Sequence, residues 1–172
     1  VHCNSIFDKL APTIHRCWSS VGHGSMNLSN AIANSCNVYF YEVGYRLAQD
    51  SSGYNSDYGL DRLAKYADMF GLTEKSGVEV TESEPKFSDE YPVPSAIGQG
   101  TNNYTTVGLA RYLTAVANSG TVYQLSILDK LTDSQGNLVE DYKPEVRNTM
   151  EIDNSIWNGL IVGMRRVVEM NA

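Results

Sequence analysis

Apolar residues recur every three or four positions in several stretches of the chain, the spacing that places them on one face of a helix. Leu60, Leu63 and Ala67 show this spacing, as do Ile156 and Leu160 further along. Residues that favour helix starts precede these stretches, and glycine follows two of them. The pattern predicts five helices, at 27–34, 35–49, 60–70, 105–119 and 153–168.

The remaining stretches read mainly as turns and loops. Residues 1–27 are rich in Gly and Ser and are predicted to be mostly loop, whereas 73–99 reads as an acidic, proline-bearing loop with one short strand at 78–80. Tyr123–Leu131 and Val139–Tyr142 flank the turn residues 134–137 and predict a β-hairpin. The fold class predicted is therefore α+β, mainly α.

Length and charge narrow the function classes. A chain of 172 residues amounts to one domain, and 42% hydrophobic residues suffice for a core. The net charge of −7 argues against nucleic-acid binding, which needs basic residues to displace counterions. No apolar run approaches the roughly 18 residues that a bilayer span needs, and no signal peptide is visible.

Three cysteines, at positions 3, 17 and 36, leave two alternatives open. Cys3 and Cys17 form a disulfide in an oxidising compartment, or all three are free buried thiols. The chain contains neither a Cys-x-x-Cys nor a His-Glu-x-x-His motif, so we expect no metal site and no cofactor. A papain-like pairing of Cys36 with His2, His15 or His23 lacks any local signature, and His23 reads as a turn residue between two glycines.

The tripeptide Ser35-Cys36-Asn37 is the strongest candidate for chemistry. It precedes the aromatic stretch 38–44, so a hydroxyl and an amide two residues apart stand at a predicted helix start. Such a pair suits a serine acyl-transfer site. The structural alternative is that Ser35 caps the helix and Asn37 satisfies a turn. In either case we expect Cys36 to point towards the core.

The surroundings of this tripeptide resemble class B penicillin-binding proteins, the monofunctional D,D-transpeptidases. The order Cys-Trp, Gly-His-Gly, Leu-x-x-Ala-Ile and Ser-Cys-Asn with aromatic residues behind it is similar to that family over 17–48. Further similar segments are Phe70-Gly71-Leu72, Lys75–Val80, Ala96–Gly100 and Ala117–Gly120. The resemblance covers Cys3–Gly120 well and the remainder loosely.

The resemblance assigns roles to two residues and leaves two motifs unmatched. It implies that Ser35 relays protons and that Asn37 binds the carbonyl of the substrate amide. The family's nucleophilic Ser-x-x-Lys has no counterpart before Ser35; the copy at Ser83–Lys86 contains a proline and is rejected. Lys75-Ser76-Gly77 occupies the place of a non-catalytic triplet, and the family's catalytic Lys-Thr-Gly is absent.

The resemblance therefore predicts that residues 1–172 are part of a transpeptidase domain. The expected fold is the helical lobe of a β-lactamase/transpeptidase-like domain with most of the central sheet missing. The parent protein would be a bacterial cell-wall enzyme that cross-links peptidoglycan stem peptides through a serine acyl-enzyme, and β-lactams would acylate it. The chain alone is expected to be inactive.

The same resemblance implies a cellular location for the parent protein and leaves one alternative function open. The parent would be anchored in the bacterial cell membrane and act on its extracytoplasmic face, whereas the fragment would be soluble. The final helix and the hairpin would expose apolar side chains or cover them by self-association. The alternative is a non-catalytic helical module that binds another protein or acts as a sensor.

Overall fold

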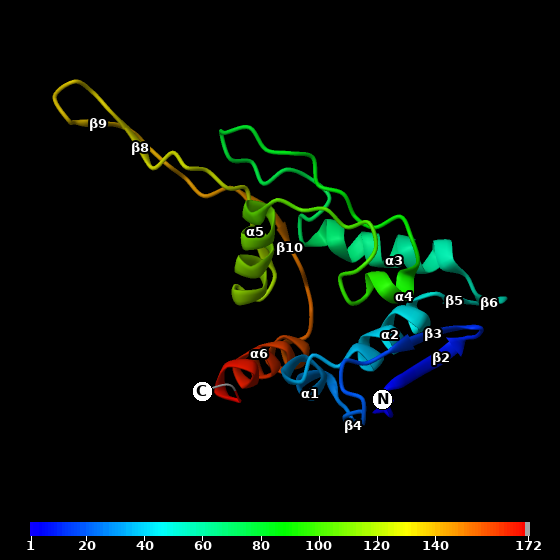
Figure 1. Ribbon diagram of the computed structural model, residues 1–172. Helices are drawn as coiled ribbons and strands as arrows, with labels where there is room; N and C mark the ends of the chain where they lie inside the picture. Colours follow the sequence, from blue (N-terminus) through cyan, green and yellow to red (C-terminus); the bar gives the residue numbers. More distant parts are fainter. Residues whose placement is uncertain (171–172) are drawn as a thin grey trace. The chain divides into compact units, whose positions relative to one another are not determined.

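Residues 1–170 are described by a computed structural model, in which the chain divides into two compact units (Figure 1). Unit 1 comprises Val1–Lys65, Ser88–Asn102 and the chain from Ile152 onward, and unit 2 comprises Tyr66–Phe87 and Asn103–Glu151. The first crossing of the chain from unit 1 to unit 2 lies within helix α3 (Ser56–Met69).

Unit 1 combines short hairpins with helices around one core. Besides the first part of α3, its elements are β1 (His2–Cys3), β2 (Ile6–Leu10), β3 (Thr13–Arg16), β4 (Gly24–Ser25), α1 (Leu28–Ala33), α2 (Asn37–Leu47), β5 (Gln49–Asp50), β6 (Gly53–Tyr54), α4 (Pro92–Ser95) and α6 (Asn154–Glu169). The antiparallel pairs are β1 with β4, β2 with β3 and β5 with β6.

The core of unit 1 forms where α2 meets the N-terminal strands. Val38 and Tyr41 lie three residues apart on α2 and are both buried, as helical periodicity requires. The ring centroid of Phe7 on β2 lies 5.9 Å from that of Tyr41 and 5.8 Å from that of Tyr45. These contacts bury one face of α2 against β2, and the same cluster includes three cysteines.

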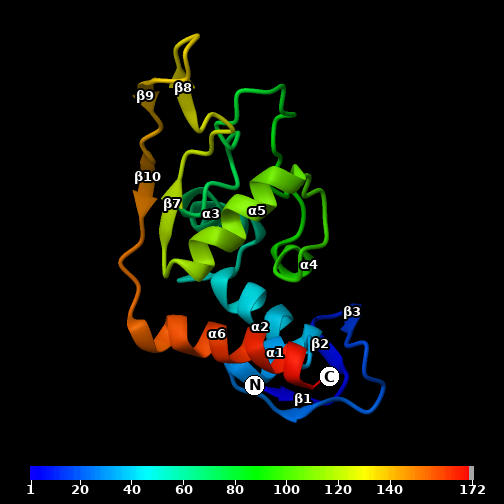
Figure 2. The ribbon, with the colours of Figure 1, turned by 90° about the vertical axis from the view of Figure 1, so that its left-hand side faces the viewer.

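Helices α1 and α6 are distant in the sequence and pack side by side (Figure 2). Gly163 permits the close approach, because a Cβ there would lie 2.9 Å from the Cβ of Ile32. Ser29 Oγ also donates a hydrogen bond of 2.8 Å to Gly159 O, and Trp157 is buried. The buried residues of α6 are therefore Trp157 and Gly163.

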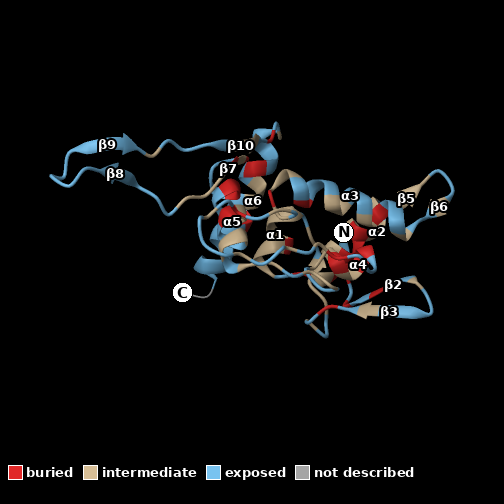
Figure 3. Cartoon of the chain, turned by 90° about the horizontal axis from the view of Figure 1, so that it is seen from above, coloured by how far each residue is buried: buried red, intermediate tan, exposed pale blue. Residues whose placement is uncertain are grey.

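Unit 2 contains the end of α3, helix α5 (Thr106–Ala117), and the strands β7 (Thr121–Tyr123), β8 (Lys130–Thr132), β9 (Leu138–Asp141) and β10 (Val146–Thr149). β7 pairs with β10, and β8 pairs with β9 to form an exposed hairpin (Figure 3). Every sheet in residues 1–170 has two strands.

The predicted helices were largely confirmed, with two corrections. Where the sequence left Asn27 or Ser29 as the cap of α1 and Thr105 or Thr106 as the cap of α5, Asn27 and Thr105 cap these helices through their side chains, and Asp153 caps α6. Helix α3 begins at Ser56, four residues before the predicted start at 60. Helix α4 lies in the stretch predicted to be a loop, because Pro92 occupies its first turn, where proline needs no N–H partner.

The strand predictions fared less well. Residues 1–27 form four short strands and were wrongly predicted to be mostly loop, whereas 78–80 has no strand. The hairpin around 134–137 was confirmed as β8–β9. Its neighbour, the β7–β10 pair, was not predicted, because such pairing joins segments more than 20 residues apart.

Apolar side chains are exposed on α6 and on the β8–β9 hairpin, as expected. On α6, Met164 is 40% exposed and Val168 is 71% exposed; on β9, Val139 is 67% exposed. Self-association through these side chains stays a prediction. None of the helices in residues 1–170 combines the length and the apolar character that a bilayer span needs.

Glu42 on α2 offers a test of how unit 1 is held together. Its carboxylate is largely buried and pairs with Lys9 on β2 and Arg46 on α2, each at 2.7 Å. Burial raises the pKa of this carboxyl, but the hydrogen bonds from Lys9 and Arg46 outweigh burial and leave the pKa below its ordinary value.

We expect Glu42→Gln to lower the free energy of unfolding at pH 7 by about 1–2 kcal/mol. The folded pKa lies below the unfolded pKa, so the carboxylate stabilises fully above the unfolded value, and this contribution is lost as pH falls through the folded value. The free energies of unfolding of wild type and Glu42→Gln should therefore converge as pH falls, which urea unfolding of both proteins from pH 7 to pH 3 would measure. Glu140→Gln, on the exposed β9, is the matched control, and a pH-independent Glu42→Gln difference would contradict the ion-pair origin.

Candidate functional site

The turn between α1 and α2 holds the Ser35-Cys36-Asn37 motif. The N–H of Ser35 donates to Ile32 O at 3.1 Å, and the N–H of Cys36 donates to Ala31 O at 2.9 Å. These are the two hydrogen bonds of a Schellman motif, which places Ser35 at the left-handed position behind α1. Its φ of 48° agrees, although glycine is the usual residue there.

The prediction that Ser35 caps α2 was therefore wrong. The cap of α2 is Cys36, which makes no side-chain capping hydrogen bond. The backbone N–H of Ser35 bonds to α1 instead, and Ser35 is an exposed residue of the turn. A non-glycine residue in this conformation costs roughly 1 kcal/mol or more, and such residues concentrate at functional sites.

One short segment, residues 16–18, contacts the backbone and side chains around the Ser35-Cys36-Asn37 motif. Trp18 Nε1 donates hydrogen bonds of 3.0 Å to the carbonyl oxygens of Asn34 and Ser35. Asn37 is the first residue of α2, and its Nδ2 lies 3.5 Å from Arg16 O. Ser35 and Asn37 thus present a hydroxyl and an amide on either side of Cys36, which is fully buried, as expected.

The rejected motifs lie in unit 2 and are unsuited to catalysis. Ser83 is in an irregular segment, as the proline at 85 predicted. Lys75 makes an ion pair of 2.6 Å with Glu84. The Ser76 hydroxyl is buried and donates to Glu82 at 2.8 Å. A buried, hydrogen-bonded hydroxyl is inaccessible to substrate.

Two glycines shape the turn that follows α4. Gly98 has a φ of 80° and Gly100 a φ of 90°, values that favour glycine. At Gly100 a Cβ would lie 2.5 Å from Ser88 Oγ, so this position excludes any larger residue.

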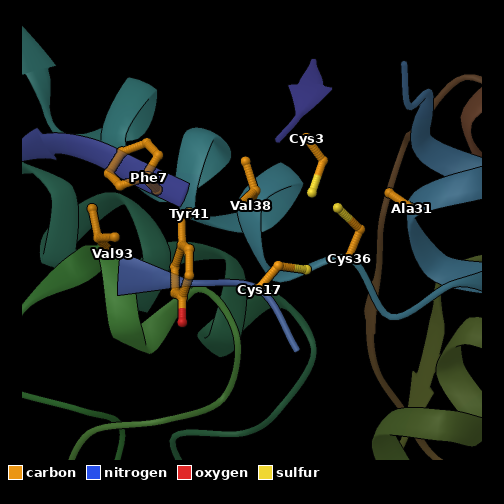
Figure 4. Close-up of a cluster of buried hydrophobic side chains, with 8 residues drawn as sticks. All are labelled: Cys3, Phe7, Cys17, Ala31, Cys36, Val38, Tyr41 and Val93. Carbon is orange, nitrogen blue, oxygen red and sulfur yellow. The ribbon is translucent and has the colours of Figure 1, made fainter. Parts of the chain in front are cut away.

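A second cluster of reactive side chains includes the middle residue of the motif, Cys36. Cys3, Cys17, Cys36 and His23 bring three sulfur atoms and one imidazole nitrogen within 4.8 Å of one another. Figure 4 shows the three thiols converging from β1, from the residue after β3 and from the residue before α2. All three cysteines are buried and free, so the alternative of a Cys3–Cys17 disulfide is not realised.

The surroundings of Cys17 and Cys36 shift the pKa values of their thiols in opposite directions. Burial opposes ionisation of Cys17, but hydrogen bonds from the backbone at Val38, Ser19 and Asn37 and from the Cys3 thiol leave its pKa below the ordinary value. Burial raises the pKa of Cys36 to about 12, and the adjoining thiols add to this effect.

Sequence reasoning missed this cluster and wrongly found no ligand set. Successive members are separated by 14, 6 and 13 residues, from position 3 to 17, 23 and 36. None of these intervals matches the short spacings of familiar metal motifs. The strand pairing that places Cys3 opposite Gly24 creates the cluster, and it was not predicted. The papain-like pairing is also excluded as a site, because Cys36 is inaccessible.

Comparison with known proteins adds independent information. Residues 6–172 match the family described as the penicillin binding protein transpeptidase domain. The chain is 25% identical over 173 residues to the peptidoglycan D,D-transpeptidase MrdA of Haemophilus influenzae, a match covering 89% of the chain and 24% of MrdA. It is 26% identical over 160 residues to penicillin-binding protein H of Bacillus subtilis, covering 84% and 23% respectively. The chain therefore spans about a quarter of the length of these relatives.

Solved structures agree on the fold. Penicillin-binding protein 2B of Streptococcus pneumoniae superimposes with a TM-score of 0.82 at 20% identity, over 97% of this chain and 30% of that one. An imipenem acyl-enzyme complex of penicillin-binding protein A from Mycobacterium tuberculosis superimposes with a TM-score of 0.77 at 14% identity, covering 98% and 38%.

Proposed function

Because the chain belongs to the penicillin-binding protein transpeptidase domain family, we propose that it forms the middle of a peptidoglycan D,D-transpeptidase domain. The whole enzyme would cross-link cell-wall stem peptides through a serine acyl-enzyme. The observation that carries the proposal is the family match over 6–172 together with a Ser-x-Asn motif on an exposed turn.

Within this chain, Ser35 and Asn37 would do the chemistry. The Ser35 hydroxyl passes a proton between the nucleophile's base and the leaving amine, which is general acid–base catalysis. The Asn37 amide donates to the carbonyl of the substrate amide and orients it for attack. The turn suits both roles, because it holds the two side chains two residues apart on a short, hydrogen-bonded junction between α1 and α2.

The nucleophile and the base would come from outside the chain. In unit 2, Ser83 and Lys75 are unsuited to these roles for the reasons given above. Most of a central sheet would likewise lie outside, since every sheet in residues 1–170 has two strands. The exposed apolar residues of α6 would pack on that sheet. The whole protein would be membrane-anchored and act on the extracytoplasmic face.

The alternative, a non-catalytic binding or sensor module, is not favoured. MrdA is named a peptidoglycan D,D-transpeptidase, and the other relatives above are named penicillin-binding proteins. The M. tuberculosis structure is an imipenem acyl-enzyme complex, so a protein of this fold reacts with a β-lactam.

The proposal is tested by covalent labelling with penicillin. Attack of the serine oxygen breaks the β-lactam amide bond, forms an ester and leaves the proton on the ring nitrogen, so the enzyme gains the full mass of the drug. We expect intact-mass spectrometry to show this gain in the full-length product of the gene and none in residues 1–172 alone. A stoichiometric gain in residues 1–172 that Ser35→Ala or Ser83→Ala abolishes would contradict the assignment, as would an unlabelled full-length product.

A further inference from the structure

The Cys3, Cys17, His23 and Cys36 cluster has the composition of a closed metal site. Four ligand atoms of the thiolate and imidazole type are those that zinc prefers in structural sites. They come from four separate segments: the end of β1, the residue after β3, the loop before β4 and the N-cap of α2. The ligand atoms lie within 4.8 Å of one another, and all three sulfurs are buried.

The separations match tetrahedral coordination. Bonds of roughly 2.3 Å to sulfur and 2.0–2.1 Å to nitrogen, at tetrahedral angles, place sulfur and nitrogen about 3.6 Å apart. His23 Nδ1 lies 3.6 Å from the sulfur of Cys3 and 3.5 Å from the sulfur of Cys17. The distances from the imidazole nitrogen to these two sulfurs are therefore those of two ligand atoms bound to the same tetrahedral ion.

The orientation of His23 points to the same conclusion. Its Nδ1 faces the thiols, whereas its Nε2 is buried and has no hydrogen-bond partner among residues 1–170. The ring is held by the loop: the N–H of His23 donates to Cys3 O at 3.1 Å, and a Cβ at Gly22 would lie 2.3 Å from that same oxygen. Gly22, with a φ of 77°, thus lets the loop bring His23 to the cysteines.

Charge completes the argument. Three buried thiols crowd one space, and neither Lys nor Arg side chains contact their sulfurs in any hydrogen bond or ion pair described for residues 1–170. Burying several thiolates in one space without a positive partner is unfavourable. A divalent ion compensates the charge of all three, which is how coordinated thiols become deprotonated.

We propose that Cys3, Cys17, His23 and Cys36 bind one zinc ion in a closed tetrahedral site with a structural role. All four positions are filled by protein ligands, so the site has no open position for a substrate or an activated water. The ion ties β1 and the loop 17–24 to the start of α2. Because Cys36 lies between Ser35 and Asn37, the same ion fixes the turn that carries both side chains. The metal site itself does not depend on the proposed function.

Zinc binding is measured on the chain of residues 1–172, purified under reducing conditions and dialysed against metal-free buffer. We expect elemental analysis to find about one equivalent of Zn²⁺ after reconstitution. Chelation should lower the thermal unfolding midpoint, since a ligand of the folded state stabilises it by mass action. Co²⁺ should replace Zn²⁺ and give the visible bands of a tetrahedral ion together with sulfur-to-cobalt charge-transfer absorption.

Variants separate this site from adventitious binding. His23→Gln should weaken Zn²⁺ binding at least about ten-fold. Removing a residue that only hydrogen-bonds to a metal ligand already costs about ten-fold or more, and His23 is a ligand itself. The matched control is His2→Gln, because His2 adjoins Cys3 but lies on the exposed edge. Cys17→Ser should reduce the charge-transfer absorption per cobalt; if it fails to fold, the His23→Gln measurement decides.

Three results would overturn the proposal. One is a folded, reduced wild-type chain without stoichiometric Zn²⁺. The second is equal Zn²⁺ affinity in wild type, His23→Gln and His2→Gln. The third is a Co²⁺ spectrum lacking the charge-transfer band, which would exclude thiolate ligands.

Discussion

Ser35→Ala and Asn37→Ala are expected to slow penicillin acylation of the full-length product by about 10²–10³-fold each. Loss of a general acid–base group costs roughly 10²–10⁴-fold, and loss of one oriented hydrogen-bond donor costs roughly 10²–10³-fold. The rate of mass gain at several penicillin concentrations measures the effect. Ser134→Ala, in the exposed β8–β9 turn, is the matched control and should leave the rate unchanged.

The backbone at Ser35 allows the hydroxyl and the turn to be tested separately. Its φ of 48° is one that glycine adopts without strain. Ser35→Gly therefore removes the hydroxyl while relaxing the turn, whereas Ser35→Ala removes it and keeps the strain. If the hydroxyl relays protons, both variants lose activity to a similar extent. Wild-type rates in Ser35→Gly would show that only the turn conformation matters.

Arg111→Met is expected to lower the free energy of unfolding of unit 2 by about 3–5 kcal/mol, the cost of disrupting a buried charged network. Arg111 on α5 is 1% exposed. Its guanidinium donates to the carbonyl oxygens of Gly71, Glu74 and Ser76 and to Gln124 Oε1. It also forms an ion pair of 3.6 Å with Glu74.

The reason for the large effect is that Met leaves these acceptors buried without donors. Each unsatisfied buried group costs roughly 1–3 kcal/mol. Arg111→Lys should recover only part of the loss, because an ammonium cannot reproduce the planar fork of donors. Urea unfolding followed by circular dichroism measures both variants. Arg165→Met, on the exposed side of α6, is the control; a change within about 0.5 kcal/mol for Arg111→Met would contradict the network.

Gly71 leaves the space that the Arg111 guanidinium fills. The residue has a φ of 72° and ends the helical stretch as the sequence predicted. A Cβ there would lie 2.8 Å from Arg111 Nη2, so only glycine leaves room for the guanidinium. The helix stop was readable from the sequence, whereas the arginine that fills the space beside it was not.

By itself the sequence determined the features that depend on near neighbours. The starts of α1, α5 and α6 follow from capping side chains at Asn27, Thr105 and Asp153, which bond to N–H groups two or three residues away. The Ser-x-Asn motif and the other short motifs, in their order along the chain, identified the family. These signals are local, or they are an order of short segments, and need no tertiary information.

The tertiary structure decided what depends on distant contacts. It alone placed Ser35 at the end of α1 instead of the start of α2, because the backbone hydrogen bonds of a Schellman motif claim that residue. It paired β1 with β4 and so brought Cys3 to Cys17, His23 and Cys36. Positions 3 and 36 are 33 residues apart, and only packing against α2 brings their sulfurs together. Local conformational preferences do not predict such a contact, because it forms only when distant segments of the chain pack together.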